Sequence, residues 1–232
     1  MSFEHPNFAI TSNFGVKKKG VTDSYISRFD LYPSFLSLLN FTLDILIRMN
    51  MHLARLGISN ELIAARGLQE CEEATRLEVA EVGADGREHL LAPSASAAWC
   101  SLKAAALVDG VDLFIVSAFR SIDRQAEIIR QKIEAGVAIE NILAVCAPPG
   151  YSEHHTGRAI DLSTPGCRAL EVEFDQTIAY AWLNKHAAEF GYYLSYPIGN
   201  SWGYQYEPWH WCHQDAQLER VASSSPSAVK NG

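Results

Sequence analysis

Four stretches of the chain carry the spacing of apolar residues and the end signals that predict helices. They are 60–75, 93–108, 121–136 and 174–190. The clearest is 121–136, where Ser121 can cap the helix and Gly136 can end it. Its isoleucines at positions 128, 129 and 133 form an apolar stripe, which predicts that this helix packs one face on the domain.

Shorter apolar runs between these stretches predict strands. They are 112–117, 158–163, 192–197 and 209–213. The segment 77–91 alternates loosely around Asp85-Gly86, a turn signal that predicts a hairpin. Helices and strands are mixed without the regular alternation of a parallel sheet. We therefore expect an α+β fold with a small antiparallel sheet flanked by helices.

The apolar segment 31–47 requires a separate interpretation, because it could pack on the domain or enter a membrane. It contains Asp44, and a carboxylate inside a membrane span costs a few kcal/mol. No cleavage site of small residues follows it. We expect an amphipathic helix on the domain, while a membrane anchor, an unusual signal or a translation start at Met49 or Met51 stay open. The predicted divisions are an extension over 1–50, a domain over 51–220 and a flexible tail over 221–232.

Composition narrows the class of protein. With 232 residues, of which 48% are apolar and 20% charged, the chain can bury a core as a soluble globular protein. Its net charge of -8 disfavours a nucleic-acid binder, which would carry a basic patch. The five cysteines are odd in number and include no CxxC pair, which argues against a cysteine zinc site. Free thiols favour a reducing compartment, so we expect a cytoplasmic location, with a periplasmic or membrane-anchored one as the alternative.

Metal-binding residue types gather in YSEHHTGRAID, residues 151–161. A catalytic zinc ion takes three protein ligands and keeps one position open. His154 and Asp161 lie on either side of a tight turn at Gly157, so both side chains can reach one ion. His210, in the later stretch YEPWH, can supply a third ligand.

A candidate general base stands close to the third ligand. Glu207 lies three residues before His210, and Pro208 stiffens the chain between them. A carboxylate at this position can accept a proton from water instead of binding the metal. The two stretches together therefore predict a hydrolytic metal site.

The two motifs, S-x-H-x-x-G-x-A-x-D from Ser152 to Asp161 and E-x-W-H from Glu207 to His210, resemble the zinc D-alanyl-D-alanine carboxypeptidase family of the vancomycin-resistance type. That family also carries a strand ending in S-G-Y-R-S. The equivalent here is SAFRS, residues 117–121, in which the glycine and the tyrosine are replaced. The resemblance covers roughly residues 93–214 and leaves out the first ninety.

The resemblance implies a small hedgehog-like α+β domain, Zn²⁺ as cofactor, and peptidoglycan stem peptides or muropeptides as substrates that lose their last D-alanine. Carried over by position, the resemblance implies that His154, Asp161 and His210 bind zinc and that Glu207 is the general base. It also implies that Arg120 stabilises the oxyanion or binds the terminal carboxylate. Ser152 and Gln125 would hold the peptide.

Three further residues near the motifs have simpler interpretations. His155 is expected at the rim of the site. His213 is expected to face away from His210, because side chains alternate along a strand. Cys212 shares a strand face with His210 and is expected to be a buried thiol.

The expected substrate depends on the compartment. A cytoplasmic location favours an L,D-carboxypeptidase that shortens a tetrapeptide to a tripeptide during cell-wall recycling. A D,D-carboxypeptidase acting on a pentapeptide and a peptidoglycan endopeptidase are the alternatives. A binding module that kept its metal but lost its chemistry is a further class, and the presence of Glu207 argues against it.

Overall fold

The computed structural model describes residues 32–214, with their side chains from Leu43 onward. Contacts divide the chain after Leu43, within helix α1, and the second unit contains every other helix and strand described below. The helices are α1 (Tyr32–Leu56), α2 (Asn60–Ala65), α3 (Pro93–Val108), α4 (Ile122–Glu134), α5 (Ile139–Leu143) and α6 (Ile178–His186). Three single 3-10 turns are η1 (Glu153–Thr156), η2 (Val172–Gln176) and η3 (Ala187–Phe190).

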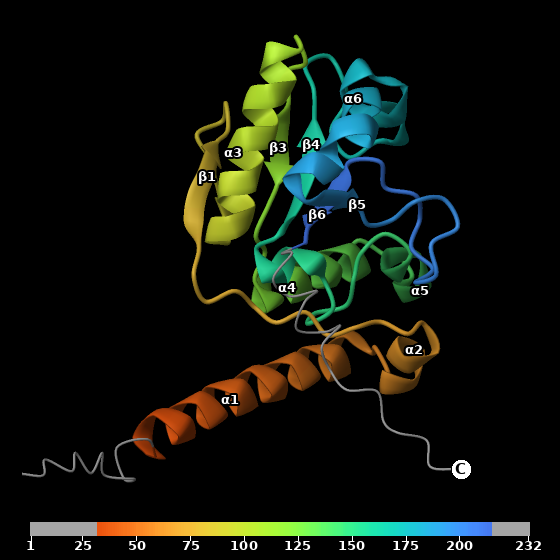
Figure 1. Cartoon of the computed structure of the whole chain (residues 1–232). Helices are drawn as coiled ribbons and strands as arrows, with labels where there is room; N and C mark the ends of the chain where they lie inside the picture. Colours follow the sequence, from red (N-terminus) through yellow and green to blue (C-terminus); the bar gives the residue numbers. More distant parts are fainter. Residues whose placement is uncertain (1–31, 215–232) are drawn as a thin grey trace, which may run out of the picture. The chain divides into compact units, whose positions relative to one another are not determined.

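The strands form two antiparallel sheets, as the sequence predicts (Figure 1). They are β1 (Glu78–Val82), β2 (Glu88–Leu91), β3 (Phe114–Ser117), β4 (Ala159–Ser163), β5 (Tyr192–Leu194) and β6 (His210–His213). The hairpin β1-β2 stands apart from a four-stranded sheet in the order β3-β4-β6-β5. The α+β prediction is confirmed, and every predicted strand has an observed counterpart.

The main core lies between one face of the four-stranded sheet and helices α3 and α6 (Figure 1). Trp99 and Leu102 of α3 pack there with Leu183 of α6, against Ile160 of β4 and Trp211 of β6. Burying each such side chain stabilises the fold by roughly 1.5–3 kcal/mol. Since side chains alternate along a strand, the neighbours of Ile160 and Trp211 point to the opposite face.

A second cluster joins the end of α1 to α4 and α5. Met49 and Leu53 are buried there, and they pack with apolar residues such as Ile129 and Ile142. Met49 also covers Gly150 so closely that an added Cβ atom there would overlap the Met49 sulfur. Residue 50, the predicted end of the extension, lies within helix α1. Among the described helices, none is both long and apolar enough to cross a bilayer.

The helix predicted over 60–75 is wrong beyond its second turn. α2 ends at Ala65, and Gly67 adopts a φ of +61° that continues the chain in a new direction. The following residues then pair with a distant loop: the Cys71 N–H donates to the Gly150 carbonyl, and the Ala74 N–H to the His155 carbonyl, both at 2.8 Å. These long-range bonds replace the local helical ones.

The helix predicted over 174–190 is also divided. The Thr177 hydroxyl donates to the Phe174 carbonyl and accepts from the Tyr180 N–H. These side-chain bonds close η2 and cap α6, so one predicted helix becomes two turns flanking a shorter helix.

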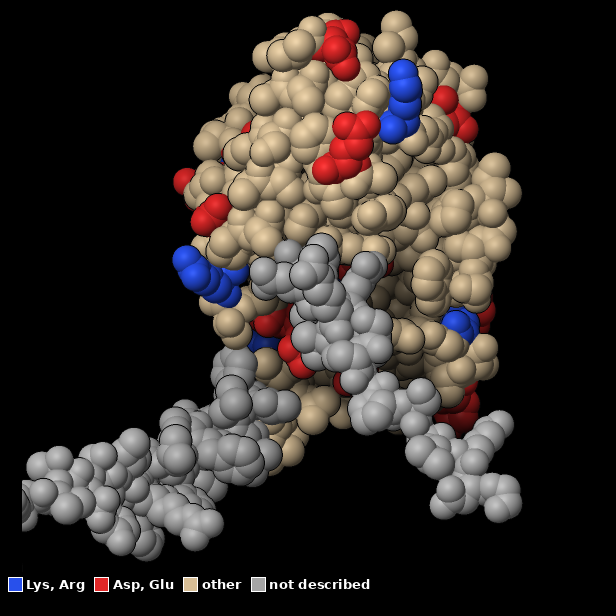
Figure 2. All heavy atoms as spheres, viewed as in Figure 1, with Lys and Arg blue, Asp and Glu red and all other residues tan. Residues whose placement is uncertain are grey.

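Charged side chains are scattered over the face drawn in Figure 2. Lysine and arginine side chains stand apart from one another on this face, with acidic ones between them. The part of this face that the described residues form therefore shows no basic patch of the kind that binds nucleic acids.

Candidate metal centre

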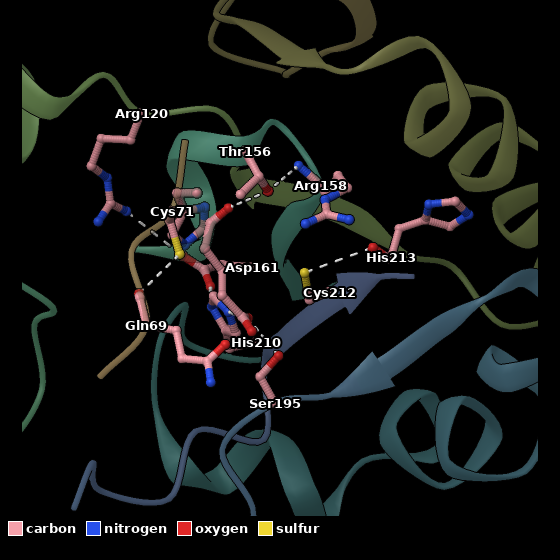
Figure 3. Close-up of polar contacts among 12 residues, drawn as sticks. Gln69, Cys71, Arg120, Thr156, Arg158, Asp161, Ser195, His210, Cys212 and His213 are labelled. Atoms are coloured by element: carbon pink, nitrogen blue, oxygen red, sulfur yellow. Dashed lines mark hydrogen bonds and ion pairs between the residues drawn. The ribbon is translucent and has the colours of Figure 1, made fainter. Parts of the chain in front are cut away.

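Strand register brings two of the predicted ligands face to face. In the β4-β6 pair, Asp161 lies opposite His210, and in the β3-β4 pair it lies opposite Ser117. His154 comes from η1, and Gly157 at φ +65° turns the chain from η1 into β4. Figure 3 shows Asp161 and His210 together at the centre, with Arg120 on one side and Ser195 on another.

The three side chains converge closely. His154 Nε2 lies 3.2 Å from Asp161 Oδ2, and His210 Nδ1 lies 2.9 Å from Asp161 Oδ1. One potential ligand atom from each residue falls within 4.8 Å of the others, and all three residues are buried. The structure thus brings the three predicted ligands into one cluster.

Hydrogen bonds on the far side of each ring determine which nitrogen can bind a cation. His154 Nδ1 lies 2.7 Å from the Ala118 carbonyl, which can only accept, so Nδ1 carries the proton and Nε2 keeps its lone pair. His210 Nε2 lies 2.9 Å from Glu153 Oε2, which leaves Nδ1 for the cation. Two imidazole nitrogens and a carboxylate are a donor set that suits catalytic zinc, so these residues fit the ion.

The electrostatics of the cluster favour a positive charge at its centre. Burial opposes ionisation of Asp161, but the two histidines outweigh it and hold the Asp161 pKa well below its usual range. Burial alone would lower the pKa of His210, but its hydrogen bonds to Asp161 and Glu153 raise that pKa to about 10. Both carboxylates therefore stabilise a cation at His210, either a proton or a metal ion that displaces it.

Glu207 lies beside the cluster in a tight turn. Its carbonyl accepts from the His210 N–H at 3.1 Å, and its own N–H donates to the Tyr196 carbonyl. Only 9% of the residue is exposed, and burial raises the pKa of Glu207 to about 7, against the opposing effect of His210. A carboxyl group with this pKa can both accept and release a proton near neutral pH.

Arg120 follows β3 and reaches the same cluster. Its Nη2 lies 4.0 Å from Asp161 Oδ2, and a fifth of its side chain is exposed. Nη1 donates to Gln125 Oε1 and Nη2 to Ser117 Oγ, both at 2.9 Å. The guanidinium is therefore held in one orientation beside the candidate ligands.

Gln125, predicted to hold the peptide, is fully buried in α4. Its Nε2 donates to the Ala147 carbonyl at 2.6 Å, while Oε1 accepts from Arg120. The Gln125 side chain therefore helps to fix the orientation of the Arg120 guanidinium. Ser152, the other predicted peptide-binding residue, is buried next to η1, and its carbonyl accepts from the His155 N–H.

His155 is not the rim residue that the sequence suggested, because it is completely buried. Its Nδ1 donates to the Arg120 carbonyl at 2.6 Å, and its Nε2 accepts from the Gly150 N–H at 3.1 Å. Burial lowers the pKa of His155 to about 4, so the ring is neutral at neutral pH. The ring links the loop before η1 to the end of β3.

Three residues that the sequence did not single out surround His210. Glu153 contacts Nε2, Ser195 Oγ donates to the same Glu153 oxygen at 2.6 Å, and the Tyr196 ring lies 4.7 Å from the His210 ring. Glu153 stands next to His154 in the stretch YSEHHTGRAID, and this adjacency was the signal that the sequence offered. Nothing in the sequence places residues 195 and 196 beside His210.

Comparison with known proteins supports the sequence resemblance. The family model described as VanY: D-alanyl-D-alanine carboxypeptidase matches residues 88–216. The Bacillus subtilis (strain 168) protein named "Putative carboxypeptidase YodJ" is 36% identical over 109 residues, which make up 46% of this chain and 40% of that protein. The chain spans less than half the length of the curated relatives that it matches.

Solved structures share the fold. The LdcB LD-carboxypeptidase is 29% identical, with a TM-score of 0.57 over 64% of this chain and 72% of that one. A mutant of the vancomycin resistance D,D-pentapeptidase VanY, in complex with Zn(II), is 25% identical, with a TM-score of 0.50 over 66% and 85%. Since the family match covers more than half of its residues, the chain belongs to the VanY family of D-alanyl-D-alanine carboxypeptidases.

Proposed function

We propose that this chain is a zinc metallocarboxypeptidase that removes the C-terminal D-alanine from peptidoglycan stem peptides. The observation that carries the proposal is the convergence of His154, Asp161 and His210 beside the buried carboxyl group of Glu207. Membership of the VanY family supports the same reaction.

The residues divide the chemistry between them. Zinc, when bound by His154, Asp161 and His210, supplies a Lewis acid that polarises a carbonyl and lowers the pKa of water. Glu207 accepts a proton from the attacking water and passes it to the amine that leaves as the C–N bond breaks. Arg120 offers a fixed positive charge to the developing oxyanion or to the terminal carboxylate.

We further propose that the preferred substrate is a tetrapeptide, which makes the activity that of an L,D-carboxypeptidase in cell-wall recycling. Two observations favour it. The LdcB LD-carboxypeptidase is more similar in sequence and fold than the D,D-pentapeptidase. All five cysteines are free, which suits a reducing compartment such as the cytoplasm. The D,D activity on a pentapeptide is the second candidate, since the VanY structure carries that name.

The experiment is mass spectrometry of zinc-loaded protein with tetrapeptide and pentapeptide muropeptides offered together. Loss of D-alanine from the tetrapeptide alone supports the L,D proposal, and loss from the pentapeptide alone replaces it with the D,D one. Internal cleavage would indicate an endopeptidase, and no cleavage of any kind would reject the proposed function.

Two variants test the roles in the same assay. Glu207→Gln should keep zinc and fold while turnover falls by about 10²–10⁴, the usual contribution of a general base. His210→Ala should lose zinc as well as turnover. Near-normal hydrolysis by Glu207→Gln would show that another group accepts the proton.

A further inference from the structure

Glu153 holds His210 from the side opposite the candidate metal position. Its Oε2 lies 2.9 Å from His210 Nε2, while His210 Nδ1 faces Asp161 on the other side of the ring. A carboxylate can only accept, so it requires the proton on Nε2 and leaves the Nδ1 lone pair for a cation.

Glu153 is itself held in place. The Ser195 hydroxyl donates to the same Oε2 atom at 2.6 Å, and Ser195 follows β5, the strand paired with the strand of His210. The next residue, Tyr196, lays its ring at an interplanar angle of 31° over the His210 ring. Glu153, supported by Ser195, thus holds the edge of the His210 imidazole, and Tyr196 covers its face.

The two histidines of the cluster differ in this respect. His154 donates its remote proton to a neutral backbone carbonyl, that of Ala118, whereas His210 donates to a carboxylate. A carboxylate partner makes an imidazole a more basic ligand and orients it. His210 is therefore the ligand whose metal affinity depends on a side chain that substitution can remove.

We infer that Glu153, supported by Ser195, is a positioning residue that sets the tautomer and orientation of His210 and thereby strengthens zinc binding. The inference rests on the proposed function for its metal, but it concerns metal affinity and needs no substrate. Neither Glu153 nor Ser195 is proposed to touch the peptide.

The test measures zinc affinity by competition with a chromogenic chelator, in wild type, Glu153→Ala, Glu153→Gln and Ser195→Ala. A hydrogen-bond partner of a metal-binding histidine typically strengthens metal affinity about 10–100-fold, so Glu153→Ala should bind zinc more weakly by that factor. Glu153→Gln keeps an acceptor oxygen and should lose less, and Ser195→Ala should shift affinity in the same direction by a smaller factor.

The chain offers a matched control. Glu189 makes the same kind of bond, 3.0 Å from His186 Nδ1, but on the surface and outside the cluster. Glu189→Ala should leave zinc affinity unchanged. Proton–nitrogen NMR of the zinc-loaded protein gives a second readout, since the hydrogen-bonded His210 Nε2–H should give a resonance in wild type that exchange with water broadens in Glu153→Ala.

The outcomes separate this inference from the proposed function. Unchanged zinc affinity in both Glu153→Gln and Ser195→Ala, or in a folded Glu153→Ala, would overturn the inference and leave the peptidase activity standing. A wild-type protein that binds zinc but cleaves no muropeptide would overturn the function and leave the role of Glu153 intact.

Discussion

Replacing Gly157 by alanine should destabilise the turn that carries the candidate metal centre, by two separable effects. Gly157 has a φ of +65°, a left-handed conformation that costs a residue with a Cβ atom about 1–2 kcal/mol. An added Cβ atom would also lie 2.8 Å from Leu77 Cδ2 and 3.0 Å from the backbone nitrogen of Ala92. The leucine can rotate away, but Ala92 cannot, because its N–H donates to the Gly157 carbonyl at 2.8 Å.

The overlap should add about 1–3 kcal/mol, the usual cost of overpacking. The lower entropy of the unfolded alanine variant returns about 0.4–1 kcal/mol. We therefore expect Gly157→Ala to lower the free energy of unfolding by about 2–4 kcal/mol, a large part of the roughly 5–15 kcal/mol typical of a domain.

Gly166→Ala is the matched control. Gly166 has a φ of +85°, but an added Cβ atom would find nothing within 4 Å. It should therefore incur only the conformational cost, about 1 kcal/mol after the unfolded-state gain. Urea unfolding of both variants, with a chelator present so that metal binding does not contribute, gives the comparison. Equal losses in the two variants would refute the argument that contacts around Gly157 hold the turn.

Two further predictions concern the buried residues behind the site. His155→Ala leaves the Arg120 carbonyl and the Gly150 N–H without their imidazole partner. Each unpaired buried group costs about 1–3 kcal/mol, so the free energy of unfolding in urea should fall by about 2–6 kcal/mol. A loss below about 1 kcal/mol would contradict this. Gln125→Leu removes the Gln125 oxygen that accepts a hydrogen bond from Arg120. A hydrogen bond to a charged group is worth about 1.5–3 kcal/mol, and this one orients the Arg120 guanidinium. We therefore expect kcat/KM to fall about tenfold or more, with zinc affinity unchanged. Gln131→Leu, on the exposed side of the same helix, should leave kcat/KM as it is.

The sequence was sufficient for those features that depend on local patterns. Strand composition and turn signals predicted the hairpin and the strands, and the ordered motifs predicted that His154, Asp161 and His210 belong together. The reason is geometric: once 158–163 and 209–213 are neighbouring antiparallel strands, alternation allows Asp161 and His210 to share a face.

The sequence was insufficient where distant backbone groups decide the structure. Residues 66–75 have helical composition, but the N–H groups of Cys71 and Ala74 donate to carbonyls about eighty residues away in sequence. His155 and Gln125 look like polar surface residues, and their burial follows only from the partners that surround them. The role of Glu153 depends on the direction of a side chain in a 3-10 turn, which no periodic pattern specifies.

The segment 150–157, which carries His154, is held in place by donors from distant parts of the chain. Its carbonyls accept from the N–H groups of Cys71, Ala74, Ala92 and Arg120, which come from three separate parts of the chain. A peptide containing only 150–163 has none of these donors and lacks His210. We therefore expect a metal ion to bind this segment only weakly when these long-range contacts are missing. Two of the donors, Cys71 and Ala74, precede the family match that begins at residue 88, so the support of this segment extends beyond the matched range.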